Sequence, residues 1–385
     1  MKRIVFLSGT RADYGKVKSL MRKVENHDDF ELHIFVTGMH MMSKYGSTYR
    51  ELEKDKFKNI YKFLNQQTGT TMDIALSNTV LGFSNYIKEI KPDLIVIHGD
   101  RLEALAGAIV GAFNNIKVAH IEGGEISGTI DESIRHAITK FSHIHLVANE
   151  EARNRIIQLG ELKENIFVIG SPDIDIMYSE QLPSLEEVKK HYSIQFDNYS
   201  ICMYHPVTTE IGEMKENAKN LVNALISSNK NYIVIYPNND LGSEEILEEY
   251  KRLEGLNRFS IFPSIRFESF LTLLKHSDLL IGNSSAGVRE TGHYGIPSID
   301  VGNRQKGRYN EQNNKHITAV EDNAVQILQA IEDLKPVSIK DFDLYGLGKS
   351  DEEFIKLLSE ENIWKIETQK RFIDYPVISK GDSYV

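Results

Sequence analysis

The chain has 385 residues, of which 41% are hydrophobic and 26% charged, with a formal net charge of −10. This length suits two globular domains, and the negative charge argues against general binding to nucleic acid or to an anionic membrane surface. No run of 18 apolar residues occurs, so no transmembrane helix is expected, and a single cysteine, Cys202, fits a cytoplasmic location.

Residues 1–175 alternate between short apolar runs and amphipathic runs, the pattern of a parallel sheet covered by helices. They predict one Rossmann-like, doubly wound α/β domain. In chain order, the strand patterns lie at 3–9, 31–38, 93–100, 117–124, 143–149 and 166–172, and the helix patterns at 15–26, 77–92, 103–115, 132–142 and 150–160.

The alternation restarts beyond a polar stretch between Pro172 and Pro183, which predicts a domain boundary there. Residues 176–363 therefore predict a second Rossmann-like domain, so that two α/β domains face a central cleft. Its strand patterns lie at 199–206, 231–240, 259–264, 278–285 and 297–302, and its clearest helix patterns at 243–255, 267–277 and 288–295.

Carboxylates follow the ends of two predicted strands, where ligands of parallel sheets bind. Asp100 ends DLIVIHGD and Glu122 follows VAHI. On neighbouring strands the two would repel each other, which would raise at least one pKa and give an acid or base usable near neutral pH. The alternative is structural: Asp100 caps the next helix, and Glu122 pairs with Arg101.

The segment TIDESIR adds a third carboxylate. Thr129 and Glu132 have the spacing of a helix capping box, which leaves Asp131 in the first helical turn and Arg135 one turn later. Asp131 either takes part in chemistry or only benefits from the helix dipole. Arg135 either orients Asp131 or neutralises it.

Two histidines also follow strand patterns. His205 precedes a proline that turns the chain, so we expect it to face the cleft, where it could bind or protonate a phosphate. His40, in VTGMH, has the comparable place in the first domain. For both, a buried structural histidine is the alternative.

Phosphate-binding features occur at several of the same strand ends. Free backbone N–H groups and hydroxyls where a strand turns into a helix favour phosphate oxygens, although a serine helix cap is the alternative. Cations beyond strand ends could converge on the same anion, or form surface salt bridges. The polar candidates are Asn283, Ser284, Ser285 and Gly287, with Glu290 for a ribose diol, and the cations are Arg11, Lys16, Arg101 and Arg304. Neither a metal site nor a cofactor is expected, because the DID and HIH patterns lack further ligands.

Taken together, GTRADYGK, HGDRLEALAGA, HIEGGEISGTIDESIRHAITK, YHPVTTE and IGNSSAGVRE resemble the UDP-N-acetylglucosamine 2-epimerases, in order through about residues 3–308. The resemblance is strongest to the hydrolysing branch, which makes N-acetylmannosamine for sialic acid synthesis. It implies a glycosyltransferase-B-like fold, with a last helix at about 364–380 packing back on the first domain.

The resemblance also implies a reaction and roles. UDP would be eliminated from UDP-N-acetylglucosamine to give a 2-acetamidoglucal, which water would then attack with inversion at C2. Asp100, Glu122 and Asp131 become the acid/base set, with Arg135 supporting Asp131, His205 serving the leaving group and His40 nearby. Arg11, Arg101, Ser284 and Ser285 would hold the diphosphate, Glu290 the ribose and Ser264 the uracil, while Arg304 would face the nucleotide.

Several alternatives stay open. Non-hydrolysing relatives usually carry GTRPE in place of GTRADYG, which favours hydrolysis here, and hydrolysing relatives that act on UDP-diacetamido-trideoxy sugars for legionaminic acid share most motifs. A retaining glycosyltransferase would not need the three carboxylates, and a nucleotide-sugar sensor would leave them idle. The resemblance further implies a homodimer or homotetramer.

Overall fold

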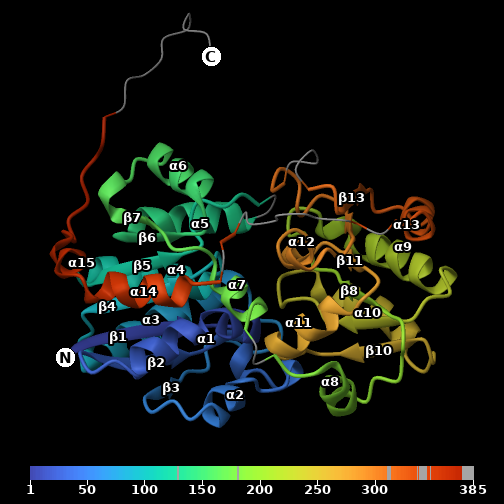
Figure 1. Ribbon diagram of the computed structural model, residues 1–385, viewed down its shortest axis with the longest axis horizontal. Helices are drawn as coiled ribbons and strands as arrows, with labels where there is room; N and C mark the ends of the chain where they lie inside the picture. The colour runs from blue at the N-terminus through green and yellow to red at the C-terminus, as the bar shows by residue number, and fades with distance from the viewer. Residues whose placement is uncertain are drawn as a thin grey trace, which may run out of the picture.

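The computed structural model describes residues 1–127, 130–179, 182–309, 314–335, 337, 345–346 and 348–374. They form two lobes that lie side by side, each built on one parallel sheet (Figure 1). This is the predicted pair of α/β units. No helix within these ranges is long and apolar enough to cross a membrane.

The first sheet has seven strands in the order β3-β2-β1-β4-β5-β6-β7. It is buried on both faces, because Ile4 and Phe6 of β1 enter one core cluster while Val5 and Leu7 enter another. Its strands are β1 Lys2–Ser8, β2 Phe30–Val36, β3 Ile60–Lys62, β4 Leu94–His98, β5 Lys117–Ile121, β6 Ile144–Val147 and β7 Ile166–Val168. The helices are α1 Arg11–Glu25, α2 Tyr49–Lys54, α3 Met72–Ile90, α4 Leu102–Phe113, α5 Ile130–Phe141, α6 Glu150–Gln158 and α7 Pro172–Met177, with 3₁₀ turns at Gly38–Met41, Ser43–Tyr45 and Lys163–Asn165.

The second sheet has six strands in the order β10-β9-β8-β11-β12-β13. Its strands are β8 Ser200–Met203, β9 Tyr232–Ile235, β10 Phe259–Phe262, β11 Leu280–Gly282, β12 Ser298–Val301 and β13 Ile317–Val320. The helices are α8 Leu185–Tyr192, α9 Met214–Ser227, α10 Ser243–Tyr250, α11 Phe267–Lys275, α12 Glu290–Tyr294 and α13 Ala324–Glu332, with 3₁₀ turns at Ile211–Glu213, Lys251–Leu253 and Ser285–Gly287. The sequence patterns did not predict the outer strands β3 and β13, because the side chains of these edge strands are only partly buried or exposed and form no apolar run.

Both sheets reverse their strand order at one place, between β1 and β4 in the first and between β8 and β11 in the second. At such a switch point the loops on the two sides run in opposite directions and leave a crevice beyond the strand ends, where ligands bind. The fold therefore brings Gly9 close to His98 in one domain, and His205 close to Asn283 in the other.

The C-terminal chain returns to the first domain. Helices α14 Ser350–Ser359 and α15 Glu361–Lys365 lie over the first lobe (Figure 1), and Phe354, Leu358 and Ile363 enter the same core cluster as Phe6 of β1. The division of the chain at residue 175, which falls inside α7, stays a prediction.

The predicted helix over 364–380 is wrong for the part that the structure describes, because 366–374 is not helical and only 361–365 is. Tertiary contacts take the place of helical hydrogen bonds there. The ring Nε2 of His143 bonds the Thr368 carbonyl at 3.0 Å, and Lys370 Nζ donates to the carbonyls of Thr139 and Ser142 at 3.1 and 2.7 Å.

Candidate active site

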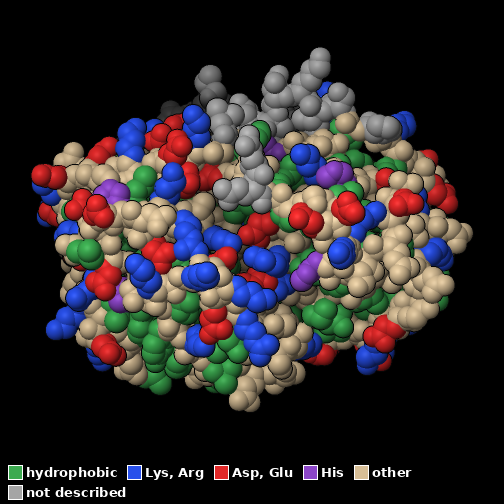
Figure 2. All heavy atoms as spheres, turned by 60° about the horizontal axis from the view of Figure 1, so that its bottom comes forward, with side chains coloured by type: hydrophobic (Ala, Val, Ile, Leu, Met, Phe, Trp, Pro, Cys, Tyr) green, Lys and Arg blue, Asp and Glu red, His purple; other side chains and the backbone are tan. Residues whose placement is uncertain are grey.

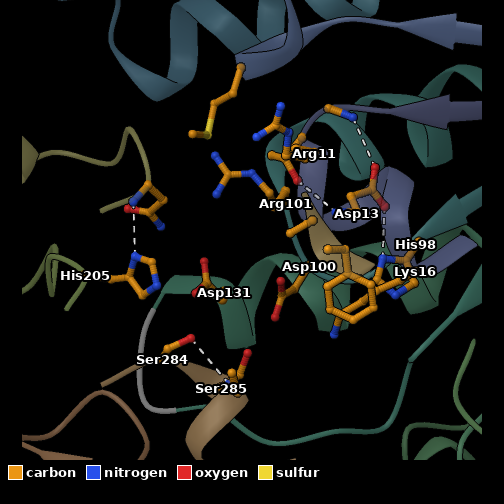
Figure 3. A pocket seen from close by; sticks show the side chains of 18 of the residues that line it. Arg11, Asp13, Lys16, His98, Asp100, Arg101, Asp131, His205, Ser284 and Ser285 are labelled. Carbon is orange, nitrogen blue, oxygen red and sulfur yellow. Dashed lines mark hydrogen bonds and ion pairs between the residues drawn. The ribbon is translucent and has the colours of Figure 1, made fainter. Parts of the chain in front are cut away.

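A cavity of about 300 Å³ lies between the two domains, beyond the carboxyl ends of their strands. Lys and Arg side chains gather around the hollow between the lobes (Figure 2). Most of the predicted residues line the cavity: Arg11, Lys16, Asp100, Arg101, Glu122, Asp131, Arg135, His205, Ser264, Ser284, Ser285, Glu290 and Arg304. Figure 3 shows Asp100, Asp131, Ser284 and Ser285 around one open space, with His205 at its edge.

Glu122 follows β5 with a backbone φ of +65°, a left-handed conformation that a glutamate adopts only under constraint. Its Oε1 lies 2.8 Å from Arg289 Nη2 and 3.3 Å from His98 Nε2, and it accepts the Ser171 hydroxyl at 2.7 Å. Burial opposes ionisation, but Arg289, Lys16 and His98 outweigh it and lower the pKa of Glu122 well below its ordinary value. Glu122 is therefore a carboxylate at neutral pH.

Asp100 follows β4 and forms a salt bridge through Oδ2 with Nη2 of the buried Arg135. Burial would raise its pKa, but Arg135, Arg308 and Arg304 together lower it. The expectation that repulsion between Asp100 and Glu122 raises one pKa is wrong, because sequence patterning did not reveal the cations that surround both carboxylates.

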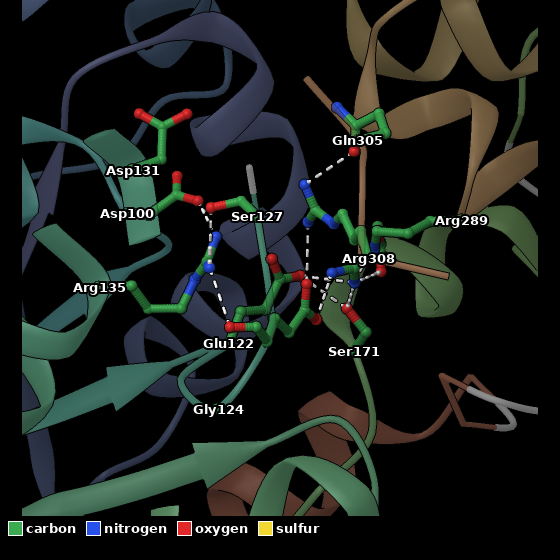
Figure 4. A network of polar contacts seen from close by, with 12 residues as sticks. Asp100, Glu122, Gly124, Ser127, Asp131, Arg135, Ser171, Arg289, Gln305 and Arg308 are labelled. Carbon is green, nitrogen blue, oxygen red and sulfur yellow. Dashed lines mark hydrogen bonds and ion pairs between the residues drawn. The ribbon is translucent and has the colours of Figure 1, made fainter. Parts of the chain in front are cut away.

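Arg135 lies on α5 and points away from Asp131. Its Nη1 donates to the Glu125 carbonyl at 2.9 Å, so it connects Asp100 to the loop after β5 (Figure 4). Its salt bridges among the described residues go to Asp100 and Glu132, and its support of Asp131 stays a prediction. Asp131 Oδ2 instead lies 3.4 Å from Nη2 of Arg304, which comes from the second domain. The predicted capping residue Thr129 lies outside the described residues.

His205 follows β8 and lines the cavity as predicted. Its Nδ1 accepts the backbone N–H of Asn238 at 3.0 Å, so a neutral ring carries its proton on Nε2. Burial, together with Arg304 and Arg101, lowers the pKa of His205 well below its ordinary value. The ring can thus donate a hydrogen bond from Nε2, but it is not a cation near neutral pH.

Two arginines from the first domain reach the second. Nη1 of Arg11 donates to the Ser264 hydroxyl at 2.9 Å, and Nη2 of Arg101 donates to Asn239 at 2.8 Å. The predicted diphosphate and uracil ligands Arg11 and Ser264 are therefore bonded to each other. Arg11 also forms a salt bridge with Glu51, so its charge is partly balanced.

The segment after β11 differs from the predicted strand-to-helix junction. Ser284 and Ser285 enter a 3₁₀ turn, and α12 begins only at Glu290 and has five residues, so a long helix dipole does not act at the two hydroxyls. Glu290 is buried, Lys16 Nζ lies 3.6 Å from its Oε1, and its Oε2 has no hydrogen-bond partner in the described part of the chain. Burial raises the pKa of Glu290, although Lys16 opposes this.

Three predicted site residues do not line the cavity. His40 is fully buried, with its ring nitrogens at 3.1 Å from the Ser8 hydroxyl and 2.7 Å from the Thr48 hydroxyl, because the 3₁₀ turn after β2 directs it into the domain. Asn283 uses its amide to bond the backbone of His205. A Cβ on Gly287 would lie 2.4 Å from the Ser298 hydroxyl, so this glycine serves packing.

Sequence reasoning missed several buried partners of the site. Asp13 Oδ1 accepts a hydrogen bond from Nδ1 of His98 at 3.0 Å. Burial opposes the protonation of His98, but Glu122 and Asp13 outweigh it and raise the pKa of His98 to about 10. Arg289 bonds Glu122 and Glu125 across the domain boundary (Figure 4). The sequence did contain a signal for His98 and for Arg289. His98 precedes GD at a strand end, and Arg289 lies inside the NSSAGVRE motif. Within the described ranges, no group of three His, Cys, Asp or Glu residues is arranged to hold a metal ion.

Comparison with known proteins decides the family. The family model described as UDP-N-acetylglucosamine 2-epimerase matches residues 22–359. The chain belongs to the UDP-N-acetylglucosamine 2-epimerase family.

Its 2-epimerase relatives differ in specificity. A UDP-N-acetylglucosamine 2-epimerase of Neisseria meningitidis serogroup B is 50% identical, over 97% of this chain and 99% of its own. A UDP-N,N'-diacetylbacillosamine 2-epimerase (hydrolyzing) of Legionella pneumophila is 33% identical, over 93% and 96%. The solved UDP-GlcNAc 2-epimerase of Methanocaldococcus jannaschii, in complex with UDP-GlcNAc and UDP, has a TM-score of 0.77 at 22% identity, over 93% and 99%.

These 2-epimerase structures confirm the predicted fold class, two parallel-sheet α/β domains with a glycosyltransferase-B-like arrangement. Membership in the family identifies the chain as an enzyme and supports UDP-N-acetylglucosamine 2-epimerase activity.

Proposed function

We propose that the protein is a hydrolysing 2-epimerase that converts UDP-N-acetylglucosamine and water to N-acetylmannosamine and UDP. One observation carries the proposal: Asp100, Glu122, Asp131 and His205, from both domains, line a single cavity between them. The hydrolysing Legionella relative and the GTRADYG motif further support this branch. The product would feed sialic acid synthesis, as the family resemblance implies.

The first step requires a base. A carboxylate takes the proton from C2 while the bond from C1 to the phosphate oxygen breaks, which leaves a C1=C2 double bond in 2-acetamidoglucal. Asp100 and Glu122 both suit proton acceptance, because neighbouring cations favour their ionised forms. Which of the two takes the C2 proton stays open.

The leaving UDP requires positive charge and hydrogen-bond donors. Arg11 and Arg101 would balance the charge that develops on the diphosphate, and Ser284 and Ser285 would donate hydroxyl hydrogen bonds. His205 would donate Nε2–H to the leaving oxygen as a neutral ring, because its Nδ1 is already an acceptor. Arg304 would face the same charge from the second domain.

The second step adds water across the double bond. The water oxygen bonds to C1, and C2 receives a proton on the face opposite to the one that lost it, so that the configuration at C2 inverts. Asp131, beside Arg304, is the candidate to accept the proton of water. Atoms balance, since one water is consumed and one UDP is released.

The nucleotide would lie against the second domain. Ser264 and its neighbours would contact uracil, and Glu290 would accept hydrogen bonds from the ribose diol. The buried Glu290 Oε2 supports this role, since it has no hydrogen-bond partner among the residues that the structure describes and a ribose hydroxyl would satisfy it.

The decisive experiment is proton NMR of the purified protein with UDP-N-acetylglucosamine in D₂O. We expect free N-acetylmannosamine with deuterium at C2 and an equal amount of UDP, and no such product from E122Q. UDP-N-acetylmannosamine would instead identify a non-hydrolysing enzyme, and turnover of neither kind would overturn the proposal for this substrate.

A second candidate substrate is a UDP-diacetamido-trideoxy sugar, favoured by the 33% identity to the Legionella enzyme. The same NMR experiment with that sugar distinguishes the two, because the preferred substrate has the higher kcat/KM. A homodimer or homotetramer and a cytoplasmic location stay predictions, and light scattering of the purified protein tests the first.

A further inference from the structure

Arg289 is a buried cation that the reaction above does not use. It is 0% exposed and does not line the cavity, so it is not placed to touch a substrate. It belongs to the second domain, between the 3₁₀ turn that carries Ser285 and helix α12. Its guanidinium crosses the domain boundary to groups of the first domain and of the segment that leaves it, and its Cζ also lies over the Tyr345 ring, 4.6 Å from the ring centre.

The contacts of Arg289 converge on acidic groups (Figure 4). Nη2 lies 2.8 Å from Glu122 Oε1 and 3.1 Å from Asp173 Oδ2, and Nη1 lies 2.5 Å from Glu125 Oε1. Ser171 accepts a further hydrogen bond from Nη2 and donates its own proton to Glu122. One guanidinium thus satisfies three carboxylates that are all nine-tenths buried or more.

Glu122 needs such a partner for two physical reasons. A buried carboxylate without a cation becomes protonated, because the low-dielectric interior disfavours its charge. Its left-handed backbone also persists only if the surrounding contacts hold it. The charged groups around it are Arg289 from the second domain, Lys16 from α1, His98 at the end of β4 with Asp13 beside it, Asp173 from α7, and Asp100 after the same strand.

We propose that Arg289 is a positioning residue that keeps Glu122 in its proton-accepting form, so that the second domain controls the base of the first. The inference rests on the proposed function, in which Glu122 belongs to the acid/base set. Because Arg289 and Glu122 lie in different domains, any opening that separates the domains by a few ångströms would remove this charge from Glu122 and leave only Lys16 and His98 to favour its ionised form.

The first test is the pH dependence of UDP release from UDP-N-acetylglucosamine. In the wild type, we expect kcat/KM to stay level down to about pH 6, since Glu122 remains ionised there. In R289Q, the acid limb of kcat/KM should move to higher pH and kcat/KM at pH 6 should fall about tenfold, because burial then opposes the ionisation of Glu122 with only Lys16 and His98 left to favour it. In R289K, which keeps the positive charge, the acid limb of the kcat/KM profile should shift less than in R289Q.

Two controls separate positioning from stability. R258Q removes a half-buried arginine elsewhere in the second domain, whose Nη2 donates to the Ile226 carbonyl, and should leave the pH profile unchanged. The affinity of each folded variant for UDP should stay within about threefold of wild type, since Arg289 does not line the cavity. An R289Q enzyme with the wild-type pH profile and only a lower Tm would overturn the proposal.

A direct titration keeps the idea testable without turnover. Glutamate labelled with ¹³C at the side-chain carboxyl gives a Glu122 resonance, assigned by its absence in E122Q. We expect it to titrate well below the ordinary glutamate pKa in the wild type and at a higher pH in folded R289Q, and the same titration in both proteins would refute the role of Arg289, since Lys16 and His98 would then suffice. If UDP-N-acetylglucosamine is not turned over, only the proposed function fails, while this titration still decides the inference.

Discussion

Asn283 and His205 are joined by two hydrogen bonds in opposite directions. The Asn283 Oδ1 accepts the His205 backbone N–H at 2.6 Å, and its Nδ2 donates to the His205 carbonyl at 2.8 Å. The two residues follow β8 and β11, the strands that flank the switch point of the second sheet. The amide therefore fixes the backbone from which the His205 ring reaches the cavity.

Replacing Asn283 with alanine should lower both stability and turnover. The His205 N–H and carbonyl would lose their partners in a buried place, at a cost of about 1–3 kcal/mol each at most. Urea unfolding and kcat/KM measure the two effects. N114A is the matched control, because the Asn114 side chain donates to the Val110 carbonyl at the end of α4, away from the cavity lining. Wild-type turnover in N283A would show that the pair does not position His205.

Replacing Glu122 with glutamine, or Asp100 with asparagine, should lower kcat by about 10²–10⁴-fold, the usual contribution of a general acid or base. The affinity for UDP, measured by calorimetry, should change little, since neither carboxylate attracts the diphosphate. If turnover persists in one variant, that carboxylate does not belong to the acid/base set.

His40 should make stability sensitive to acid. Burial lowers the pKa of His40 to about 4, whereas an unfolded histidine titrates near 6.5. Between about pH 6.5 and about pH 4 the histidine binds a proton only in the unfolded state. The contribution of His40 to the free energy of unfolding is therefore fully present above about pH 6.5 and falls by up to about 1.4 kcal/mol per pH unit until about pH 4. Thermal unfolding of wild type and H40N from about pH 7 to pH 5 measures this difference.

We expect a shallower fall in H40N, with turnover reduced mainly through its lower stability. If H40N were as stable as the wild type but inactive, the result would support the catalytic role that the sequence predicted for His40. H143N offers a comparison, because burial also lowers the pKa of His143 to about 4, far from the cavity.

Lys370 should contribute to stability more than an ordinary surface lysine does. It donates to two carbonyls at the end of α5 and pairs with the buried Glu161, so K370A would leave these groups with fewer partners and cost about 1–3 kcal/mol. K365A removes an exposed pair within α15 and should cost less than about 1 kcal/mol. Equal Tm values of the two variants would show that the contacts of Lys370 do not stabilise the fold more than an exposed ion pair does.

The sequence predicted the place of the site because the apolar runs show where strands end. Asp100, Glu122 and His205 follow apolar runs, and the topology of parallel sheets places such positions at one edge. It could not find Arg289 as a partner of Glu122, because 167 residues separate them and only the packing of the two domains joins them. His40 shows the converse error, since it follows a strand as His205 does, yet a turn after β2 buries its ring.

The return of the C-terminal chain has a consequence for how the protein is made. Phe354 packs edge-on against Phe6 with ring centres 6.1 Å apart, so the core under β1 contains side chains that are translated after the whole second sheet. While the ribosome is still synthesising the second domain, the first exposes the apolar face that α14 later covers. The nascent first domain is thus incomplete until α14 and α15 have emerged, and a fragment that ends near residue 175 would keep that face exposed to chaperones and to aggregation.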